Sequence, residues 1–201
     1  MILIVFATFT EAQSSLQALE AKPRTQEGLF AFDDGYIVLS GLGVVNAATA
    51  VARYGLDASE IWNAGLAGSL RSDWEVGDLL SIGSVTKNLC LPDDTSVHAK
   101  GVAGETFDEI VVGEGRARLV SSDFPVYAQT ERERLGLVAD VVDMEGYGIA
   151  AAARALNKPC KIWKMVSDNA DAGGHRSLQA NRDALGRGVS ELLVSRFDAA
   201  L

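Results

Sequence analysis

The chain has 201 residues, of which 48% are hydrophobic and 22% charged, and its formal net charge is −9. These proportions are ordinary for a globular protein, and a chain of this length can bury about 70% of the surface that it exposes when unfolded, so intrinsic disorder is not expected. The negative charge argues against nucleic acid or an anionic membrane surface as a partner, which leaves a neutral or zwitterionic small molecule as the expected one.

The N-terminal part predicts a buried strand, a helix and a hairpin. ILIVFA at 2–7 is a continuous apolar run, typical of a strand covered on both faces. It lacks the basic region of a signal peptide, and no apolar run reaches the roughly 18 residues that cross a bilayer, so we expect a cytoplasmic protein. Thr10 is predicted to cap a helix over 11–20. FAF at 30–32 and YIVLS at 36–40, joined by Asp-Asp-Gly, predict a β-hairpin.

The next segments alternate helix and strand. GLGVVNAATAVARYG at 41–55 predicts a glycine turn followed by an alanine-rich helix. EIWNAG at 60–65 predicts a buried strand ended by GLAGSL, and DLLSIGSV at 78–85 predicts another strand. From 86 to about 137 the pattern is polar and broken, which indicates several weak strands and one short helix at TERERLG.

A clear alternation returns in the C-terminal part. ADVVDMEG predicts a strand that leads into a helix from about Met144 to Leu156. CKIWKMV at 160–166 predicts the next strand, SDNADAGGH a loop, and 177–196 a last helix.

Strands that alternate with helices predict an α/β fold of three layers, in which helices flank a central, mixed, mostly parallel twisted sheet. We expect one domain over 1–201, since neither a linker nor a repeat is visible. Ligands of such folds gather at the carboxyl ends of the strands. This rule selects five clusters, which are predicted to meet in one pocket: 9–11, 41–44, 65–69, 143–145 and 167–168.

Cysteine and histidine do not predict a metal site or a disulfide framework. Cys90 and Cys160 are far apart and form no C-x-x-C pattern, so buried reduced thiols are expected. His98 and His175 are too few and too scattered for a metal cluster. The G-x-G at 41–43 lacks the third glycine of a dinucleotide fingerprint. We therefore expect neither a metal nor a nucleotide cofactor.

Acidic residues at the strand ends have both structural and chemical interpretations. Glu11 can stabilise a helix N-terminus by roughly 0.3–1 kcal/mol, or it can orient and deprotonate a water molecule. Asp143 can cap the following helix, which contributes about 1 kcal/mol. Glu145 can accept hydrogen bonds from both hydroxyls of a ribose, beside the soft apolar surface of Met144.

The end of the strand at 160–166 has the same ambiguity. Ser167 and Asp168 can form a turn, or Asp168 can be an acid kept protonated by burial so that it donates a proton. Lys164 would oppose such a role if its charge came close to Asp168. The glycines of GLG and of GLAG at 65–68 allow the backbone to approach a ligand closely.

Taken together, VVDMEGYGIAAAA and KIWKMVSDNAD resemble two signature segments of the purine nucleoside phosphorylase and nucleosidase superfamily. GLGVVNAATA resembles the glycine segment before the second helix of that family. ATFTEAQ resembles the opening segment of its hydrolytic branch, which contains methylthioadenosine/S-adenosylhomocysteine nucleosidase and futalosine hydrolase. The similarity covers most of the chain, and the middle matches poorly.

The resemblance implies a role for each matching residue. It implies that Glu11 activates water, that Glu145 holds the ribose hydroxyls, and that Asp168 protonates the leaving purine at N7. It implies that Met144 packs against sugar and base, and it implies a homodimer. The candidate substrate-binding residues, including one from the possible base-binding segment VYAQT at 126–130, are Gly43, Leu66, Ala67, Gly68, Gln129, Met144, Lys164 and Ser167.

Departures from the family pattern bear on the reaction. Lys164 stands where the nucleosidases usually carry arginine. Leu66 stands where many members have a hydroxyl that would bind phosphate, which together with Glu11 favours hydrolysis over phosphorolysis. VYAQT does not match the adenine-binding pattern of methylthioadenosine nucleosidases. The first choice of substrate is therefore futalosine, an intermediate of menaquinone synthesis. Methylthioadenosine or S-adenosylhomocysteine cleavage, a phosphorylase, and a nucleoside-binding protein without turnover remain the alternatives.

Overall fold

Ten strands form one mixed sheet in this computed structural model, which describes residues 1–88 and 109–198. The strands are β1 (Ile2–Phe6), β2 (Lys22–Pro23), β3 (Leu29–Phe32), β4 (Gly35–Leu39), β5 (Glu60–Ser69), β6 (Leu79–Lys87), β7 (Ile110–Val111), β8 (Ala117–Ser121), β9 (Val141–Asp143) and β10 (Cys160–Asp168). The helices are α1 (Phe9–Ala18), α2 (Val44–Tyr54), α3 (Gln129–Gly136), α4 (Gly146–Ala155) and α5 (Gly174–Asp198).

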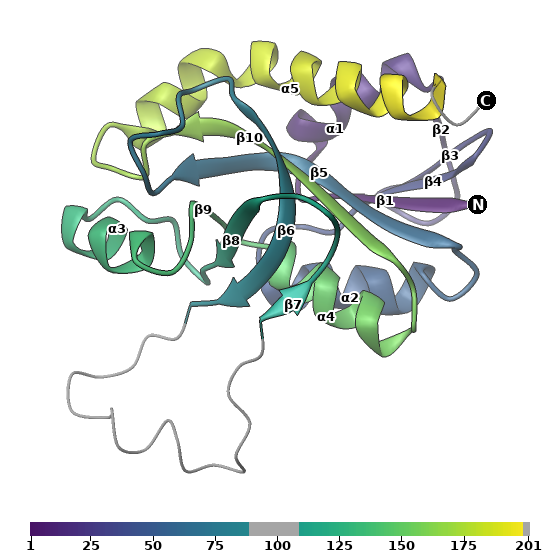
Figure 1. The fold of residues 1–201 in the computed structure, drawn as a ribbon. Helices are drawn as coiled ribbons and strands as arrows, with labels where there is room; N and C mark the ends of the chain where they lie inside the picture. Colours follow the sequence, from purple (N-terminus) through teal and green to yellow (C-terminus); the bar gives the residue numbers. More distant parts are fainter. Residues whose placement is uncertain (89–108, 199–201) are drawn as a thin grey trace.

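The predicted three-layer α/β fold is confirmed. Helices α1 and α5 cover one face of the sheet, and α2 and α4 cover the other (Figure 1). Ile4 and Phe6 pack on the side of α1 and α5, whereas Leu3 and Val5 pack on the side of α2 and α4. Because side chains alternate along a strand and both faces are covered, β1 is apolar at every position.

The sheet has a parallel centre and closes on itself at one side. Strands β4, β1, β5 and β10 are parallel neighbours. Strand β10 also pairs with β6, which continues through β8 and β9 back to β5. Five strands therefore form a ring around their own apolar core, which includes Ile82, Leu119 and Val166.

The ring brings the ends of three strands to one point. Gly68 near the end of β5 pairs with Asp168 of β10 on one side and with Val142 of β9 on the other. Because β9 and β10 both pair with Gly68 of β5, the residues that follow Val142 lie close to Asp168. This register is what places the acidic strand ends together.

Helix α1 begins earlier than predicted. Its cap is Thr8, whose hydroxyl accepts the Glu11 N–H at 3.4 Å, while Glu11 Oε2 accepts the Thr8 N–H at 3.0 Å. This reciprocal pair is a capping box. Thr10 lies within the first turn of the helix, so the prediction that it caps the helix is wrong.

Two other boundaries differ from the sequence predictions. Strand β5 continues to Ser69 rather than ending at Gly65, because the GLAGS segment forms ladder bonds with β10 and then with β9. Helix α5 begins at Gly174, before the predicted 177. The hairpin of β3 and β4 and the short helix at α3 are confirmed. Cys90 and His98 lie outside the described residues.

None of the helices in the described ranges is both long enough and apolar enough to cross a membrane.

Candidate active site

A cavity of about 400 Å³ lies at the carboxyl ends of β5, β9 and β10 and beside the first turn of α1. This volume is within the range of small-molecule sites. Most of the predicted site residues line it, namely Glu11, Leu66, Ala67, Gly68, Met144, Glu145, Ser167 and Asp168. The structure therefore brings three acids from distant parts of the chain, Glu11, Glu145 and Asp168, to one cavity.

The Glu11 carboxylate stabilises the start of α1, and Glu11 also lines the cavity. Its Oε2 accepts hydrogen bonds from the N–H and the hydroxyl of Thr8, at 3.0 and 3.1 Å. Its Oε1 lies on the side of Gly65, 3.5 Å from the place where a Cβ of that residue would be. One oxygen therefore fixes the helix end and orients the carboxylate, while the other lies beside Gly65 of β5.

Glu145 is buried, with 6% of its surface exposed, and is held by the backbone before α2. Its Oε1 accepts the N–H of Gly43 at 2.8 Å. Burial is the main cause that raises the pKa of Glu145 to about 7, and the charge of Asp143 adds to it, against the opposing effects of Lys164 and the Gly43 N–H. A carboxyl group with a pKa this far above its ordinary value marks Glu145 as a candidate functional group.

Gly43 does not line the cavity, in contrast to the prediction that it contacts substrate. It acts one step away, because its amide binds Glu145. Its backbone angles, φ 98° and ψ 154°, belong to a region that is essentially restricted to glycine. Nothing lies within 4 Å of the position of a Cβ at residue 43, so the conformation, and not the available space, requires glycine.

The Asp143 carboxylate has more partners than the capping of a helix requires. Its Oδ2 accepts the N–H of Gly146, the first residue of α4, at 2.8 Å, but the N-cap position of this helix is Glu145 and not Asp143 as predicted. The same oxygen forms an ion pair with Lys164 Nζ at 2.8 Å, and Oδ1 accepts the hydroxyl of Ser121 at 2.6 Å. Asp143 therefore connects β8, β9, α4 and β10 below the cavity.

Lys164 lies under the cavity and is not among its lining residues, in contrast to the prediction that it contacts substrate. The side chains of Lys164 and Asp143 are only 2% and 1% exposed. Burial lowers the pKa of Lys164, but the charges of Asp143, Glu145 and Glu11 outweigh it, and the pKa is raised overall. Its partner is Asp143 and not Asp168, which answers the question that the sequence left open.

Asp168 sits in a turn at the end of β10 and also faces the cavity. Its Oδ1 accepts the N–H of Ala170 at 2.8 Å, and its Oδ2 lies 2.6 Å from the hydroxyl of Ser167. The Ser167 hydroxyl is also 3.2 Å from the carbonyl oxygen of Ala67. It can therefore donate to an ionised Asp168, or donate to Ala67 while it accepts from a protonated Asp168. Ser167 thus supports either protonation state of the acid.

Gln129 does not reach the cavity, contrary to the prediction that it contacts the base. It is the first residue of α3, exposed, and its amide donates to Glu133 at 2.8 Å. Residues just before it do line the cavity, including Phe124, Val126 and Tyr127. Phe124 is 73% exposed, so it presents an aromatic ring at the cavity. The apolar FPVY run in a polar stretch is the signal that could have identified this wall.

One face of α5 forms another wall that the sequence reasoning missed. His175, Leu178 and Arg182 lie three and four positions apart, on one side of the helix, and all three line the cavity. The prediction that the last helix begins at 177 placed His175 in a loop. These residues add the cationic side chain of Arg182 to a cavity that otherwise carries acids.

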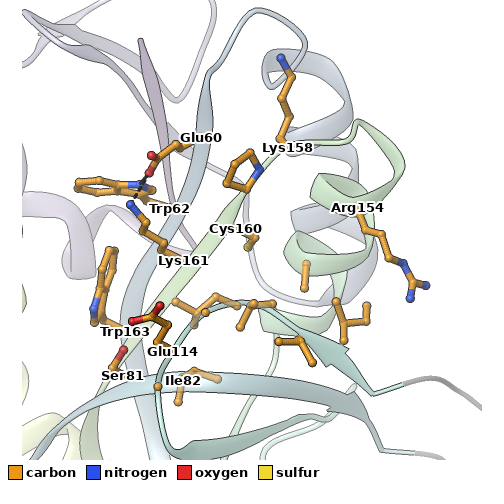
Figure 2. Close-up of a pocket in the computed structure, with 18 of the residues that line it drawn as sticks. Glu60, Trp62, Ser81, Ile82, Glu114, Arg154, Lys158, Cys160, Lys161 and Trp163 are labelled. Atoms are coloured by element: carbon orange, nitrogen blue, oxygen red, sulfur yellow. Dashed lines mark hydrogen bonds and ion pairs between the residues drawn. The ribbon is translucent and has the colours of Figure 1, made fainter.

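A larger hollow of about 1130 Å³ lies at the opposite ends of β5 and β10, and Figure 2 shows its residues. Two of its charged groups are paired with each other: Glu60 Oε2 accepts the indole N–H of Trp62 at 2.7 Å and binds Lys161 at 2.8 Å (Figure 2). Burial raises the pKa of the free thiol of Cys160 to about 12, which keeps it neutral. The smaller cavity, which brings together three acids from distant parts of the chain, is therefore the candidate active site.

Comparisons with known proteins agree with this fold. The family described as the phosphorylase superfamily matches residues 12–196. The aminodeoxyfutalosine nucleosidase of Helicobacter pylori is 29% identical over 154 residues, a match that covers 67% of this chain and 66% of that protein, slightly less than two thirds of its length.

Solved structures are similar over nearly the whole chain. A futalosine hydrolase mutant of Helicobacter pylori strain 26695 superposes with a TM-score of 0.85 at 20% identity and covers 98% of each chain. The methylthioadenosine/S-adenosylhomocysteine nucleosidase of Neisseria meningitidis, in complex with methylthio-immucillin-A, has a TM-score of 0.78 at 23% identity and covers 96% of each chain. At these identities, the structures establish the shared fold.

Proposed function

This chain belongs to the phosphorylase superfamily, and we propose that it is a purine nucleoside hydrolase, which cleaves the N-glycosidic bond with water. The observation that carries the proposal is the meeting of the Glu11, Glu145 and Asp168 carboxylates at one cavity of nucleoside size. Breaking this bond builds positive charge on the sugar and negative charge on the departing base. Three separate carboxyl groups can serve both needs.

The departing base is protonated by Asp168. The Ser167 hydroxyl, 2.6 Å from Asp168 Oδ2, stabilises the acid before and after it gives up its proton. General acid catalysis of this kind contributes about 10²–10⁴-fold to the rate. This supports the role that the resemblance implies, protonation of the purine at N7.

The sugar is held by Glu145 and attacked with the help of Glu11. An ionised Glu145 accepts both ribose hydroxyls and favours the cationic character that the sugar acquires. Glu11, oriented by Thr8, presents its other oxygen to the attacking water. Met144, next to Glu145 in the lining, supplies an apolar contact for sugar and base.

The charges of the cavity favour water over phosphate as the nucleophile. Four carboxylates line it, from Glu11, Asp143, Glu145 and Asp168. The buried cation beneath them, Lys164, is already paired with Asp143, and Arg182, the cation of the lining, pairs with Asp183 outside the cavity. Leu66 contributes an apolar side chain where a phosphate-binding hydroxyl would be needed. A phosphate anion would meet like charges here, and these charges oppose its binding.

Futalosine and its 6-amino analogue are the first candidates as substrate. The aminodeoxyfutalosine nucleosidase and futalosine hydrolase of Helicobacter pylori support this choice. Methylthioadenosine is the second candidate, because a similar Helicobacter pylori nucleosidase mutant holds it in its active site. The proposal also includes one domain over 1–201, a cytoplasmic location and a homodimer. Leu42 and Val45, which are 57% and 74% exposed, offer apolar surface for a dimer contact.

A chromatographic product assay tests the function. The protein is incubated with futalosine, its 6-amino analogue, methylthioadenosine and inosine, each with and without phosphate. We expect release of free base and free sugar without phosphate for at least one of them. Release that strictly requires phosphate, with ribose 1-phosphate as product, would establish a phosphorylase instead. Tight binding of an intact nucleoside without cleavage over hours would establish a binding protein.

A further inference from the structure

The ammonium group of Lys164 lies directly beneath the acids of the cavity. Its Nζ is 2.8 Å from Asp143 Oδ2, and both side chains are almost fully buried. Lys164 Nζ and Glu11 Oε1 each lie 3.5 Å from the position of a Cβ at Gly65. The cation and the Glu11 carboxylate therefore both border the small space that the absent side chain of residue 65 leaves.

Within residues 1–88 and 109–198, the charged groups that act on Lys164 come from three segments, and all are acids. Asp143 is at the end of β9, Glu145 is just before α4, and Glu11 is in α1. One buried cation thus stands against three carboxylates. Burial makes every unpaired charge costly, so the loss of the cation would favour protonation of one of the acids.

Glu145 is the acid that would take up this proton. Asp143 accepts hydrogen bonds from Ser121 and Gly146 in addition to its ion pair, and these donors stabilise its ionised form. Glu11 accepts two hydrogen bonds from Thr8. Glu145 accepts the single N–H of Gly43, and it is buried beside Asp143. Its ionised form therefore depends most on the nearby cation.

We propose that Lys164 is a positioning residue that, from its ion pair with Asp143 beneath the cavity, keeps Glu145 in the ionised form that accepts the two ribose hydroxyls. The inference rests on the proposed binding of a nucleoside. Lys164 touches no substrate in this scheme and acts only through Glu145. The direction of the proposed effect agrees with the electrostatics of the site, because burial and Asp143 raise the pKa of Glu145 while Lys164 lowers it.

The test is the pH dependence of kcat/KM for nucleoside cleavage in Lys164→Met, which keeps the length of the side chain and removes its charge. We expect the acidic limb of the profile to move upward by about one pH unit or more, with a roughly tenfold loss of kcat/KM at pH 7 for each unit. Lys164→Arg, which restores the charge, keeps the limb near its wild-type position. An equal loss of kcat/KM at every pH, with the limb unmoved, would overturn the proposal.

Two further variants separate charge from packing. Lys161→Met removes another lysine of the same strand, which pairs with Glu60 at the opposite end of β10, and should leave the limb in place. Lys164→Met combined with Asp143→Asn removes both charges of the pair, so the limb should return toward wild type. If Lys164→Met does not fold, as judged by circular dichroism, the double variant is compared with Asp143→Asn alone, and loss of the lysine charge should place its limb at higher pH; equal limbs in these two variants would overturn the proposal.

A binding measurement separates this inference from the proposed hydrolysis. Formycin A contains the same ribose diol, but a carbon–carbon bond joins its base, so it cannot be hydrolysed at that bond. Calorimetric titrations with formycin A should show the same upward displacement in Lys164→Met. If the pH profile of binding shifts in Lys164→Met but no nucleoside is cleaved, the inference is supported and the hydrolase is rejected. If the wild type cleaves a nucleoside but neither pH profile shifts in Lys164→Met, the hydrolase is supported and the inference is rejected.

Discussion

The backbone N–H of Gly43 donates a 2.8 Å hydrogen bond to Oε1 of Glu145, which is 102 positions later in the chain. This bond joins the turn before α2 to the turn before α4. It fixes one oxygen of Glu145 and leaves the other for a ligand. The geometry depends on a backbone conformation that only glycine adopts readily.

Gly43→Ala is therefore expected to weaken substrate binding. Strain at residue 43 costs about 1–3 kcal/mol, and relief of this strain turns the N–H away from Glu145. We expect KM to rise about tenfold or more, with a smaller effect on kcat. Gly77→Ala is the matched control, because Gly77 has φ +99°, equally open space around its Cβ position, and no place in the cavity lining. Equal effects of both variants on KM would contradict the role of the Gly43 amide.

Glu145→Gln is expected to make the protein more stable above neutral pH while it lowers activity. The pKa of Glu145 is raised from 4.5 to about 7 in the folded protein. Its contribution to stability is therefore fully present below about pH 4.5 and is lost as the pH rises through 7. The neutral amide avoids this loss. Urea unfolding at pH 5 and pH 8 should show the variant gaining up to about 3 kcal/mol on wild type at the higher pH. A pH-independent difference would contradict the raised pKa.

Asp168→Asn is expected to lower kcat by about 10²–10⁴-fold, because the amide cannot protonate the departing base. The fold should remain, since an amide oxygen can still accept the N–H of Ala170. Single-turnover cleavage of the best nucleoside measures the chemical step, and the melting temperature controls for folding. Near-normal turnover in this variant would remove Asp168 from the mechanism.

Leu66→Ser tests whether a hydroxyl alone converts the site to phosphorolysis. We expect it not to, because the carboxylates that line the cavity still oppose a phosphate anion. Product analysis in phosphate buffer should detect free sugar and no ribose 1-phosphate. The appearance of ribose 1-phosphate would mean that residue 66, and not the charge of the cavity, selects water.

Local patterns were sufficient for most of the fold. The apolar run at 2–7 and the hairpin at 30–40 are confirmed because burial and turn chemistry act over a few residues. The same holds for the strand ends that carry Glu145 and Asp168. The rule that parallel strands present ligands at their carboxyl ends was enough to bring these acids together in the prediction, and the cavity contains both.

The predictions that were wrong concern boundaries and side-chain directions that depend on residues distant in the sequence. Thr8 and Thr10 are both suitable caps, and the position of Glu11 chooses between them. Strand β5 extends beyond Gly65 because β9 and β10 supply partners that no local pattern reveals. The direction of the Lys164 side chain likewise depends on Asp143, across the interior. Gln129 faces outward because α3 begins there.

The ring of β5, β10, β6, β8 and β9 has consequences for how this scaffold tolerates change. An extra residue in one of these five strands shifts its register against a neighbour on each side, and the shift cannot be absorbed at a free margin. The hairpin of β3 and β4 is at the other side of the sheet, where the turn at Asp33 and Asp34 joins its strands. Peptide tags or loop grafts placed in that turn should leave the acids undisturbed, while single-residue insertions in the ring should abolish activity. The architecture thus divides the molecule into a half that resists sequence drift and a half that can accept new segments.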